Sequence, residues 1–325
     1  MVIMALNSGE EVKALKYNEY DFEVGDDTND FAIKILLSEW EDIPDGAYLY
    51  IPGTEYGGIY RRTEIDTKQG YISVGGLTWR GMLQSKIIEP EPGADYAIDD
   101  GDINTIINNR VSAAFDGLMV GGLPLGKEIT YRYNRYVTLY DGLKAMLQKY
   151  GYRLRIVYDI SIKRVIVDAV PIVDYSDKIE FSDDMRANYY VNSDGTGVNH
   201  LICLGNGQLK DRIVIHLYAD AEGNISQEQT FFGKDEIAAV YDYAGADSEQ
   251  LLQSGTEQFK TLQSINEFSV DVEAQDIEVG DIVGGKDYVS GLTMKAPVTG
   301  KIHKSSGSVT ATEYTISNNV EVHKQ

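Results

Sequence analysis

The sequence predicts a mainly β fold of the α+β class, with two barrel-like β domains to which α/β and helical pieces are attached. Short β-rich runs occur near both ends, runs with helical spacing of apolar residues lie between them, and turn residues separate the runs. A chain of 325 residues with 43% hydrophobic residues is long enough for two or more domains with packed cores. We expect the β domains at 1–92 and, in two halves, at 174–240 and 267–325, with an α/β insert at 93–173 and a helical insert at 241–266.

The first 90 residues contain mainly β-strand signals. The runs FAIKILL, AYLYIPG, GGIYRRTEID and GYISVGGLTW are rich in β-branched and aromatic residues and begin at residues 31, 47, 57 and 70. Pro44-Asp45-Gly46 and Gly57-Gly58 are turn signals between them. Several short strands at regular spacing predict a small barrel or a sandwich.

The pattern changes to α/β after residue 93. DINTIINNRVSAAF (102–115) has apolar residues at helical spacing and begins with an aspartate, which suits the positive end of a helix. A second helix is expected at 138–150, where Thr138 is a good N-cap. The β-rich runs at 152–160 and 164–170 then predict a hairpin.

A second β region is expected to begin near residue 178. Strand signals are found in NHLICLGN, DRIVIHLYAD and ISQEQTFF, which span 199–206, 211–220 and 225–232. Residues 247–264 have the apolar spacing of one helix, and strands resume at residue 268 and alternate to the end of the sequence.

A short echo links the two β regions. Residues 21–26 read DFEVGD, and residues 276–281 read DIEVGD. In both places we expect glycine to permit a turn and aspartate to end it before a strand. The echo fits an ancient duplication and a chance match equally.

The charge balance excludes several classes of partner. The chain has 51 Asp and Glu against 29 Lys and Arg, and its net charge of −22 repels DNA and anionic membranes. A surface that DNA passes without sticking is compatible with this charge. No segment resembles a signal peptide, and no apolar run approaches the roughly 20 residues of a membrane span. An excess of tyrosine, 23 against eight phenylalanines, favours half-buried strands and interfaces.

The sequence has no recognisable catalytic or metal-binding constellation. Its single cysteine, Cys203, lies in the strand-like run HLICL and not at a helix start that would activate a thiolate, so a thiol protease is disfavoured. We expect His216 to lie on a strand face. The histidines follow no ligand spacing, and they are His200, His216, His303 and His323. We therefore expect no metal ion, no cofactor and no enzymatic activity.

Two glycine-containing stretches fail as ligand loops. GNGQLKDR (205–212) lacks the spacing of a phosphate-binding loop and is better explained as a hairpin turn. IDDGDIN (98–104) fails as a calcium loop, because Tyr96 would then occupy the first ligand position, where an aspartate is required. We interpret its aspartates as a cap for the helix that follows.

The alternative function is an acidic, β-rich glycosidase that is secreted or held at the cell surface. A chain with 51 acids will always place some pair of carboxylates close together, and glycosidases use such a pair. Sugar-binding clefts are rich in tryptophan, whereas this chain has only Trp40 and Trp79, and neither sits in an aromatic cluster of the kind that stacks on sugars.

One segment departs from the general acidity. Residues 127–164 carry nine basic and three acidic residues and include YRYNRY (131–136). Interleaved bases and aromatics occur at nucleic-acid sites, and also in strands with tyrosines on one face and solvated arginines on the other. In so acidic a chain we favour a third interpretation, contact with an acidic surface of a neighbouring copy. The candidate interface residues are Tyr131, Arg132, Tyr133, Arg135 and Tyr136.

Four stretches together carry a family resemblance. They are GLTWRGMLQSKIIEPEPG (76–93), TLYDGLKAMLQKYGYRLRIVYD (138–159), VNHLICLGNGQLKDR (198–212), and the helix at 247–264 followed by SVDVEAQDIEVGDIVGGKDYVSGLTMKAPVTGKI (269–302). In order and spacing they resemble the end of the first barrel, the insert, the return into the second barrel and its last half in the baseplate hub proteins of phage tails. These hubs are also called tail-associated (Tal-like) proteins, and the resemblance is to siphovirus-type members over nearly the whole chain.

The resemblance implies a structural role in a phage or prophage-derived tail. In the family, three copies place six barrels around an axis, so that a homotrimer closes the tail tube, adapts sixfold to threefold symmetry and anchors tip proteins. The implied partners are a distal tail protein or the tail tube, a tape measure protein, and a tail fibre or tip protein, while DNA only passes through the channel. Peptidase, lysozyme-like or fibre domains of other members are expected to be absent or to belong to another protein here. We expect synthesis in the bacterial cytoplasm, a final place at the virion tail tip or baseplate, and no membrane insertion.

Overall fold

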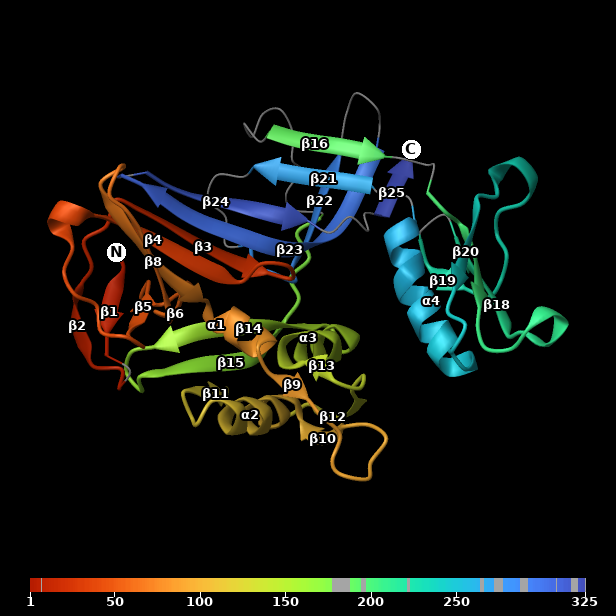
Figure 1. Ribbon diagram of the computed structural model, residues 1–325, viewed down its shortest axis with the longest axis horizontal. Helices are drawn as coiled ribbons and strands as arrows, with labels where there is room; N and C mark the ends of the chain where they lie inside the picture. Colours follow the sequence, from red (N-terminus) through yellow and green to blue (C-terminus); the bar gives the residue numbers. More distant parts are fainter. Residues whose placement is uncertain are drawn as a thin grey trace. The chain divides into compact units, whose positions relative to one another are not determined.

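The computed structural model describes residues 1–6, 8–176, 188–193, 197–220, 223–263, 266–271, 277–286, 292–307, 309–316 and 321–324 (Figure 1). The predicted start of the second β region near 178, and parts of the strands predicted between 268 and 302, lie outside the described residues. The chain divides into two compact units, and each is described by itself. The first contains Met1–Tyr175, Asp271–Ile282 and Pro297–Thr315, and the second contains Ser176–Val270, Val283–Ala296 and Ile316–Gln325.

The N-terminal part of the first unit consists of two packed sheets. Its strands are β1 (Ile3–Ala5), β2 (Glu11–Ala14), β3 (Glu19–Gly25), β4 (Asp30–Leu36), β5 (Tyr48–Tyr50), β6 (Gly57–Ile59), β7 (Arg62–Asp66) and β8 (Tyr71–Leu77), and a 3-10 turn, Leu37–Glu39, follows β4. The strands β3, β4, β8 and β7 are neighbours in one sheet, and β2, β1, β5 and β6 are neighbours in the other. The four predicted runs are confirmed as strands, and the run that begins at residue 57 forms two of them.

The two sheets share a core, as the prediction of a barrel or sandwich requires. Side chains alternate in and out of this core along each strand, and the buried ones include Phe22, Phe31, Ile33, Leu49 and Val74. A bridge between Gly58 and Thr78 joins the two sheets at one end. A Cβ atom at Gly58 would lie 2.1 Å from the carbonyl oxygen of Leu77, so only glycine permits this approach.

The α/β part of the first unit follows. Its elements are α1 (Trp79–Gln84), β9 (Ile87–Ile88), β10 (Ile98–Asp102), α2 (Ile103–Ala114), β11 (Met119–Gly121), β12 (Glu128–Arg132), β13 (Val137–Thr138), α3 (Leu139–Lys149), β14 (Tyr152–Asp159) and β15 (Arg164–Pro171). The helices predicted at 102–115 and 138–150 are confirmed as α2 and α3, and Asp102 and Thr138 cap them. The predicted hairpin is confirmed as β14 and β15, which pair antiparallel over their full length.

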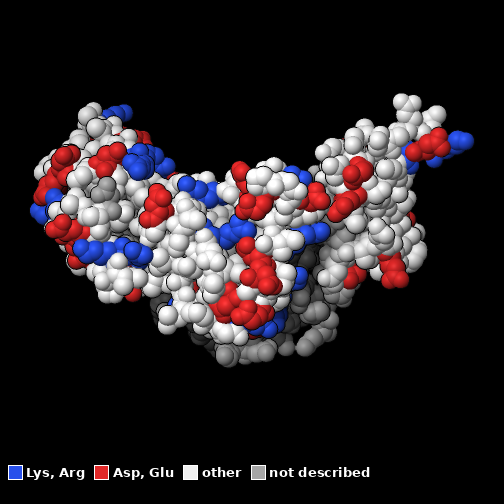
Figure 2. Space-filling view, turned by 90° about the horizontal axis from the view of Figure 1, so that it is seen from below, with Lys and Arg blue, Asp and Glu red and all other residues white. Residues whose placement is uncertain are grey.

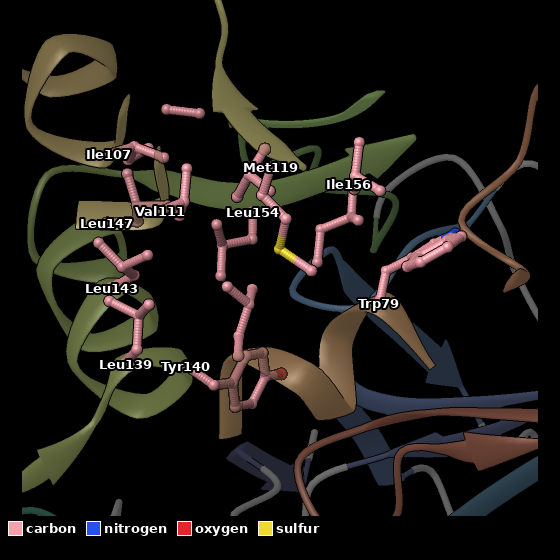
Figure 3. Close-up of a cluster of buried hydrophobic side chains, with 14 of the residues drawn as sticks. Trp79, Ile107, Val111, Met119, Leu139, Tyr140, Leu143, Leu147, Leu154 and Ile156 are labelled. Atoms are coloured by element: carbon pink, nitrogen blue, oxygen red, sulfur yellow. The ribbon is translucent and has the colours of Figure 1, made fainter. Parts of the chain in front are cut away.

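A second core lies between this α/β part and the sheet of β1 and β5. Figure 3 shows Ile107 and Val111 of α2 and Leu143 of α3 directed toward Leu154 of β14. The side chains of β1 and β5 that point away from the large sheet, among them Ile3, belong to this second core. The small sheet is therefore a middle layer with the large sheet on one face and the α/β part on the other.

The C-terminal part of the chain returns to the first unit. Strand β23 (Leu292–Ser306) pairs antiparallel with β3, from Gly300 opposite Gly25 to Ser306 opposite Glu19. Strand β24 (Val309–Ile316) follows β23 and is its neighbour in the sheet, and β22 (Ile282–Lys286) also pairs with β23.

The two echo motifs have different conformations. Residues 21–25 belong to β3, whereas residues 278–280 form a turn in which Gly280 has a φ of 97°. The expectation of a glycine turn is thus confirmed at Gly280 and wrong at Gly25, which remains in the strand because it pairs with β23. Asp276 lies outside the described residues.

The second unit contains a four-stranded sheet covered by one helix. Its elements include β16 (Asn188–Ser193), β17 (His200–Leu204), β18 (Val214–Ala219), β19 (Ile225–Ser226), β20 (Ala238–Asp242), α4 (Ser248–Leu262), β21 (Asn266–Asp271) and β25 (Glu321–Lys324), and two 3-10 turns, Leu209–Asp211 and Gly233–Asp235. The order in the sheet is β19-β18-β17-β20, and β16 pairs with β21. The predicted helix at 247–264 is confirmed as α4, which begins with a capping box on Asp247. No helix in the described ranges is long and apolar enough to cross a bilayer.

Two predicted strands are shorter than expected. The strand predicted at 70–79 ends at Leu77, because the Thr78 hydroxyl accepts from the Gly81 N–H and starts α1. The strand predicted at 225–232 ends at Ser226, whose hydroxyl accepts from the Glu228 N–H at 3.2 Å. In both cases a short polar side chain bonds to the nearby backbone and ends the strand.

Candidate functional site

The predicted interface segment, residues 131–136, spans the end of β12 and the turn after it. Tyr131 and Arg132 close β12, and the N–H of Tyr133 still bonds to the Ala97 carbonyl oxygen at 2.9 Å. Tyr136 then adopts a φ of 54°, in the left-handed region, before β13 begins. The segment is therefore a strand that ends in a tight turn.

Tyr133 belongs to the core and has no surface for a partner. Its side chain is 1% exposed, its hydroxyl donates to the sulfur of Met146 at 3.2 Å, and the Arg110 guanidinium lies 5.4 Å from its ring centre. Burial raises the pKa of Tyr133 above its usual value. Its inclusion among the interface residues is corrected, because strand alternation turns this ring inward.

Of the other four candidates, Arg132, Arg135 and Tyr136 are exposed, whereas Tyr131 is partly buried and packs against the core, with its ring 4.9 Å from that of Tyr133. Tyr136 is 59% exposed, and Arg135 lies over its ring at 5.5 Å. The Arg132 guanidinium lies 4.3 Å from the ring centre of Tyr96, and Tyr131 is half-buried beside it in the sequence. We call the exposed residues Arg132, Arg135 and Tyr136 the tyrosine–arginine patch. Stacked guanidinium and phenol groups of this kind are enriched at protein interfaces.

The basic residues around the patch do not form a broad positive field. Three of the nine bases in 127–164 form ion pairs with acids elsewhere in the first unit, namely Lys144–Asp26 at 2.5 Å, Arg153–Asp281 at 2.7 Å and Arg155–Asp168 at 2.5 Å. On the face shown in Figure 2, basic side chains lie in small separate groups among acidic and uncharged ones. Duplex DNA is bound by continuous basic surfaces, so this mixture favours a protein partner.

A buried polar network links three elements of the first unit. Arg80 of α1 donates to Glu55 at 2.6 Å and to the hydroxyl of Tyr140 in α3 at 3.3 Å. Lys301 of β23 lies 3.1 Å from the other oxygen of Glu55 and 2.5 Å from Glu278. This network has no signal in the sequence, because its members are far apart in the chain.

The network holds Glu55 in its ionised form. Burial alone would raise the pKa of Glu55, but Arg80 and Lys301 outweigh it and lower the pKa to about 2. The pKa of Lys301 is raised, since its two carboxylate partners outweigh its burial. A glycosidase needs a carboxyl group that keeps its proton at neutral pH, and Glu55 is tuned in the opposite direction.

The second unit brings two histidines together that the sequence analysis describes as scattered. His200 Nε2 lies 2.8 Å from His216 Nδ1, and His200 Nδ1 lies 2.5 Å from Glu236. His216 lies on a strand face, as predicted. The cross-strand register, with Ile202 opposite His216, places both histidines on one face of the sheet.

Cys203 lies on the other face of this sheet. Its thiol is fully buried against α4, and burial raises its pKa. The side chain therefore points away from His200, which is an odd number of residues along the same strand. A cysteine–histidine pair for nucleophilic catalysis is not formed.

The aromatic residues also differ from a sugar site. Trp79 lies in a buried aromatic cluster, where it stacks on Tyr158 at 5.8 Å and meets Tyr48 edge to face at 5.7 Å. The indole is fully buried, so it cannot stack on a ligand. Within the described ranges, no group of three or more His, Cys, Asp or Glu residues is arranged to hold a metal ion.

Comparison with known proteins places the fold. No protein-family model matches the chain, and no curated protein matches its sequence. Among solved structures, the chain is similar to the 43 kDa tail protein of prophage MuSo2 from Shewanella oneidensis, with a TM-score of 0.57, 11% identity and 98% of each chain covered. It is also similar to the tail protein from Neisseria meningitidis MC58, with a TM-score of 0.51, 12% identity, and 97% of this chain and 95% of that chain covered.

The chain therefore has the β-rich α+β fold of phage tail proteins. The likeness runs from one end of the chain to the other, so it is not limited to a single module. The fold class and the resemblance predicted from the sequence are confirmed.

Proposed function

We propose that this chain is a non-enzymatic structural component of a phage or prophage-derived tail, located at the baseplate or tail tip. In this role it forms a ring that closes the tail tube, adapts sixfold to threefold symmetry and anchors tip proteins. Its partners are a distal tail protein or the tube, a tape measure protein, and a fibre or tip protein. DNA passes through the ring without binding.

The observation that carries this proposal is the end-to-end likeness to prophage tail proteins. Two physical features support it. A net charge of −22 disfavours attachment to DNA in transit, and the tyrosine–arginine patch supplies an exposed surface suited to protein contacts. The glycosidase alternative gains no support, because Glu55 is held ionised and Trp79 is buried.

The proposal is tested by genetic complementation in the phage or lysogen that encodes the chain. Deletion of the gene should leave lysates without complete tails in electron micrographs, and the intact gene should restore them. Complete, infectious tails from the deletion strain would refute the structural role.

The patch is tested in the same system. The double variant Arg132→Glu/Arg135→Glu should assemble fewer tails, and the loss should change with the salt concentration of the lysate. The matched control is Lys16→Glu/Lys68→Glu, which makes the same change in net charge at two other exposed positions and should assemble normally. Equal defects in the two double variants would indicate that net charge, and not the patch, is responsible.

A further inference from the structure

A cleft of about 530 Å³ lies in the first unit along one strand. Its wall includes the turn 53–56, Arg80, five consecutive residues of β14 (153–157), and alternate residues of β23 and β24. Consecutive residues of a strand border a cavity when the strand presents its edge, because side chains alternate between the two faces. Strand β14 is the last strand of the sheet β11-β15-β14, so the cleft follows its unpaired edge.

The direction of the backbone groups follows from the neighbouring strand. In β15, the N–H of Val165 donates to the Leu118 carbonyl oxygen at 2.9 Å, and the N–H of Ala169 donates to the Asn104 side chain at 2.9 Å. Backbone groups alternate in direction along a strand. The backbone N–H and C=O groups of the odd-numbered residues of β15 therefore point away from β14. Those of the even-numbered residues point toward it.

The register then assigns the groups of β14. Arg155 lies opposite Asp168, so the odd-numbered residues of β14 exchange hydrogen bonds with β15. The hydrogen bond from the Ile172 N–H to the Gly151 carbonyl oxygen follows the same rule, since it joins an even-numbered residue that follows β15 to an odd-numbered residue that precedes β14. The backbone N–H and C=O groups of Leu154 and Ile156 consequently point to the free edge and into the cleft.

These four backbone groups lack a partner in the described part of the chain. As whole residues, Leu154 and Ile156 are 4% and 2% exposed. Native proteins almost always pair such shielded groups. Natural edge strands are also protected by proline, a bulge or a charged side chain that points inward, whereas β14 contains no proline and its register with β15 is unbroken.

The side chains beside the edge define the chemistry of a partner. Arg153 and Arg155 lie on one face of β14 and border the cleft. Arg155 is 54% exposed and donates to Asp168 through Nε and Nη2, which leaves Nη1 to donate to a partner. Arg153 donates to Asp281 through Nε. A strand laid along the edge would place every second side chain beside these arginines, where a carboxylate completes charge-assisted hydrogen bonds.

We propose that the edge of β14 is a docking site for an extended segment of a partner protein that carries acidic side chains at alternate positions. The segment adds a fourth strand to the sheet β11-β15-β14 and pairs with the backbone of Leu154 and Ile156. The five residues that border the cleft offer roughly 13 Å of edge. This inference goes beyond the proposed function and stands independently of it, because it concerns binding by the isolated chain.

The probe is a fluorescein-labelled hexapeptide that alternates glutamate with valine, added to the purified full chain and followed by fluorescence anisotropy. If the peptide adds as an antiparallel strand with its glutamates beside the arginines, its valines lie opposite Leu154 and Ile156. The valine N–H groups then donate hydrogen bonds to the backbone of these two residues. N-methylation of the valines should then weaken binding about tenfold, as expected for two lost hydrogen bonds, while N-methylation of the glutamates should not. A parallel strand gives the reverse pattern, so loss with only one of the two methylated peptides supports the proposal and reports the direction.

Matched variants test the side chains. Arg155→Gln should lower the affinity for the glutamate peptide several-fold, and Arg135→Gln should leave it unchanged, with thermal unfolding used to check that both variants fold. A peptide with lysine in place of glutamate should bind at least tenfold more weakly. Failure of the glutamate peptide to bind at millimolar concentration, or equal binding by both methylated peptides, would overturn the proposal.

Discussion

At the scale of single residues, the stability of the first unit depends on how three buried charges, Glu55, Arg80 and Lys301, satisfy one another. Glu55 is the only carboxylate that contacts both Arg80 and Lys301 in the described structure. Arg80 and Lys301 are each 3% exposed, so neither cation can recover its hydration if Glu55 is changed. Removal of one member of such a group costs more than the group as a whole contributes, because a charge is left buried without a counter-charge.

We predict that Glu55→Gln lowers the free energy of unfolding by about 3–5 kcal/mol, since the amide leaves two buried cations with one carboxylate, Glu278, between them. Urea unfolding followed by circular dichroism measures the change. The control, Glu64→Gln, alters an exposed residue of β7 and should stay within about 0.5 kcal/mol of the parent. A similar small change in both variants would show that the network does not stabilise the fold.

The same residue predicts a pH dependence. The pKa of Glu55 is about 2 in the folded chain against an ordinary value of 4.5, so the unfolded chain binds the proton more tightly. The stability that Glu55 contributes is therefore complete above pH 4.5 and is lost as the pH falls toward 2. In urea unfolding at a series of pH values, the gap between the parent and Glu55→Gln should narrow across this window. A gap that stays constant from pH 6 to pH 2 would contradict the lowered pKa.

Local patterns predict residues well only where the structure is itself local. Asp102 and Thr138 could be identified as caps because a cap bonds to a backbone group within three residues. Tyr133 was misplaced because a composition argument for a surface segment ignores strand alternation, which turns this ring inward. The pairing of Glu55 with Lys301 had no sequence signal, because the two residues meet only after the C-terminal strands return to the first unit.

At the scale of elements, the two echo motifs attach the α/β part through aspartates. Asp26, after β3, accepts from the Tyr140 hydroxyl at 3.1 Å and pairs with Lys144, so it holds α3. Asp281, the last residue of the second motif, pairs with Arg153 at 2.7 Å and so holds β14. The motifs differ in backbone conformation, yet their last aspartates make comparable contacts, which a duplication and convergent packing explain equally.

Helix α4 approaches its sheet closely because Gly255 has no side chain. A Cβ atom at this position would lie 2.6 Å from the Cys203 sulfur and 3.3 Å from Leu217. Gly255→Ala should therefore destabilise the chain by about 1–3 kcal/mol, although alanine is the better helix former by about 1 kcal/mol. Urea unfolding measures this balance.

The close contact between Gly255 and Cys203 also predicts a rescue. The double variant Gly255→Ala/Cys203→Ala exchanges the sulfur for the new methyl group and should recover most of the lost stability, since the volume is nearly conserved. Gly245→Ala, with nothing within 4 Å of its added methyl group, is the control for backbone effects. Additive losses in the double variant would mean that the sulfur does not set the helix position.

At the scale of the whole molecule, the order of β and α/β segments was predictable, but the pairing between distant strands was not. Hydrophobic period and turn residues define each segment from its own sequence. The antiparallel pairing of β23 with β3, and the parallel pairing of β20 with β17, join segments that are separated by other elements. Such pairings depend on competition among all exposed strand edges, and the sequence of one strand does not determine which strand pairs with it.

Features of the composition and the surface indicate that this chain assembles with other protein chains. The tyrosine excess, the exposed tyrosine–arginine patch and the extreme acidity of the remaining surface are features of a chain with surfaces to be covered by other proteins. Head-to-tail contacts between identical copies either close into a ring or extend into a fibre, and a tail tip requires closure. The hub resemblance sets the number of copies at three.

We therefore predict a trimer in the assembled tail, with strands of the two β regions alternating around a central channel. The wall of this channel should consist mainly of Asp, Glu and uncharged polar residues, because bound phosphates would stall the passage of DNA. We expect that the isolated chain can remain monomeric in dilute solution, since in the proposed role the tube above and the fibre below would reinforce the ring. Cryo-electron microscopy of the tail tip measures both properties, and a ring of two or six copies, or a channel lined with Lys and Arg, would refute the prediction.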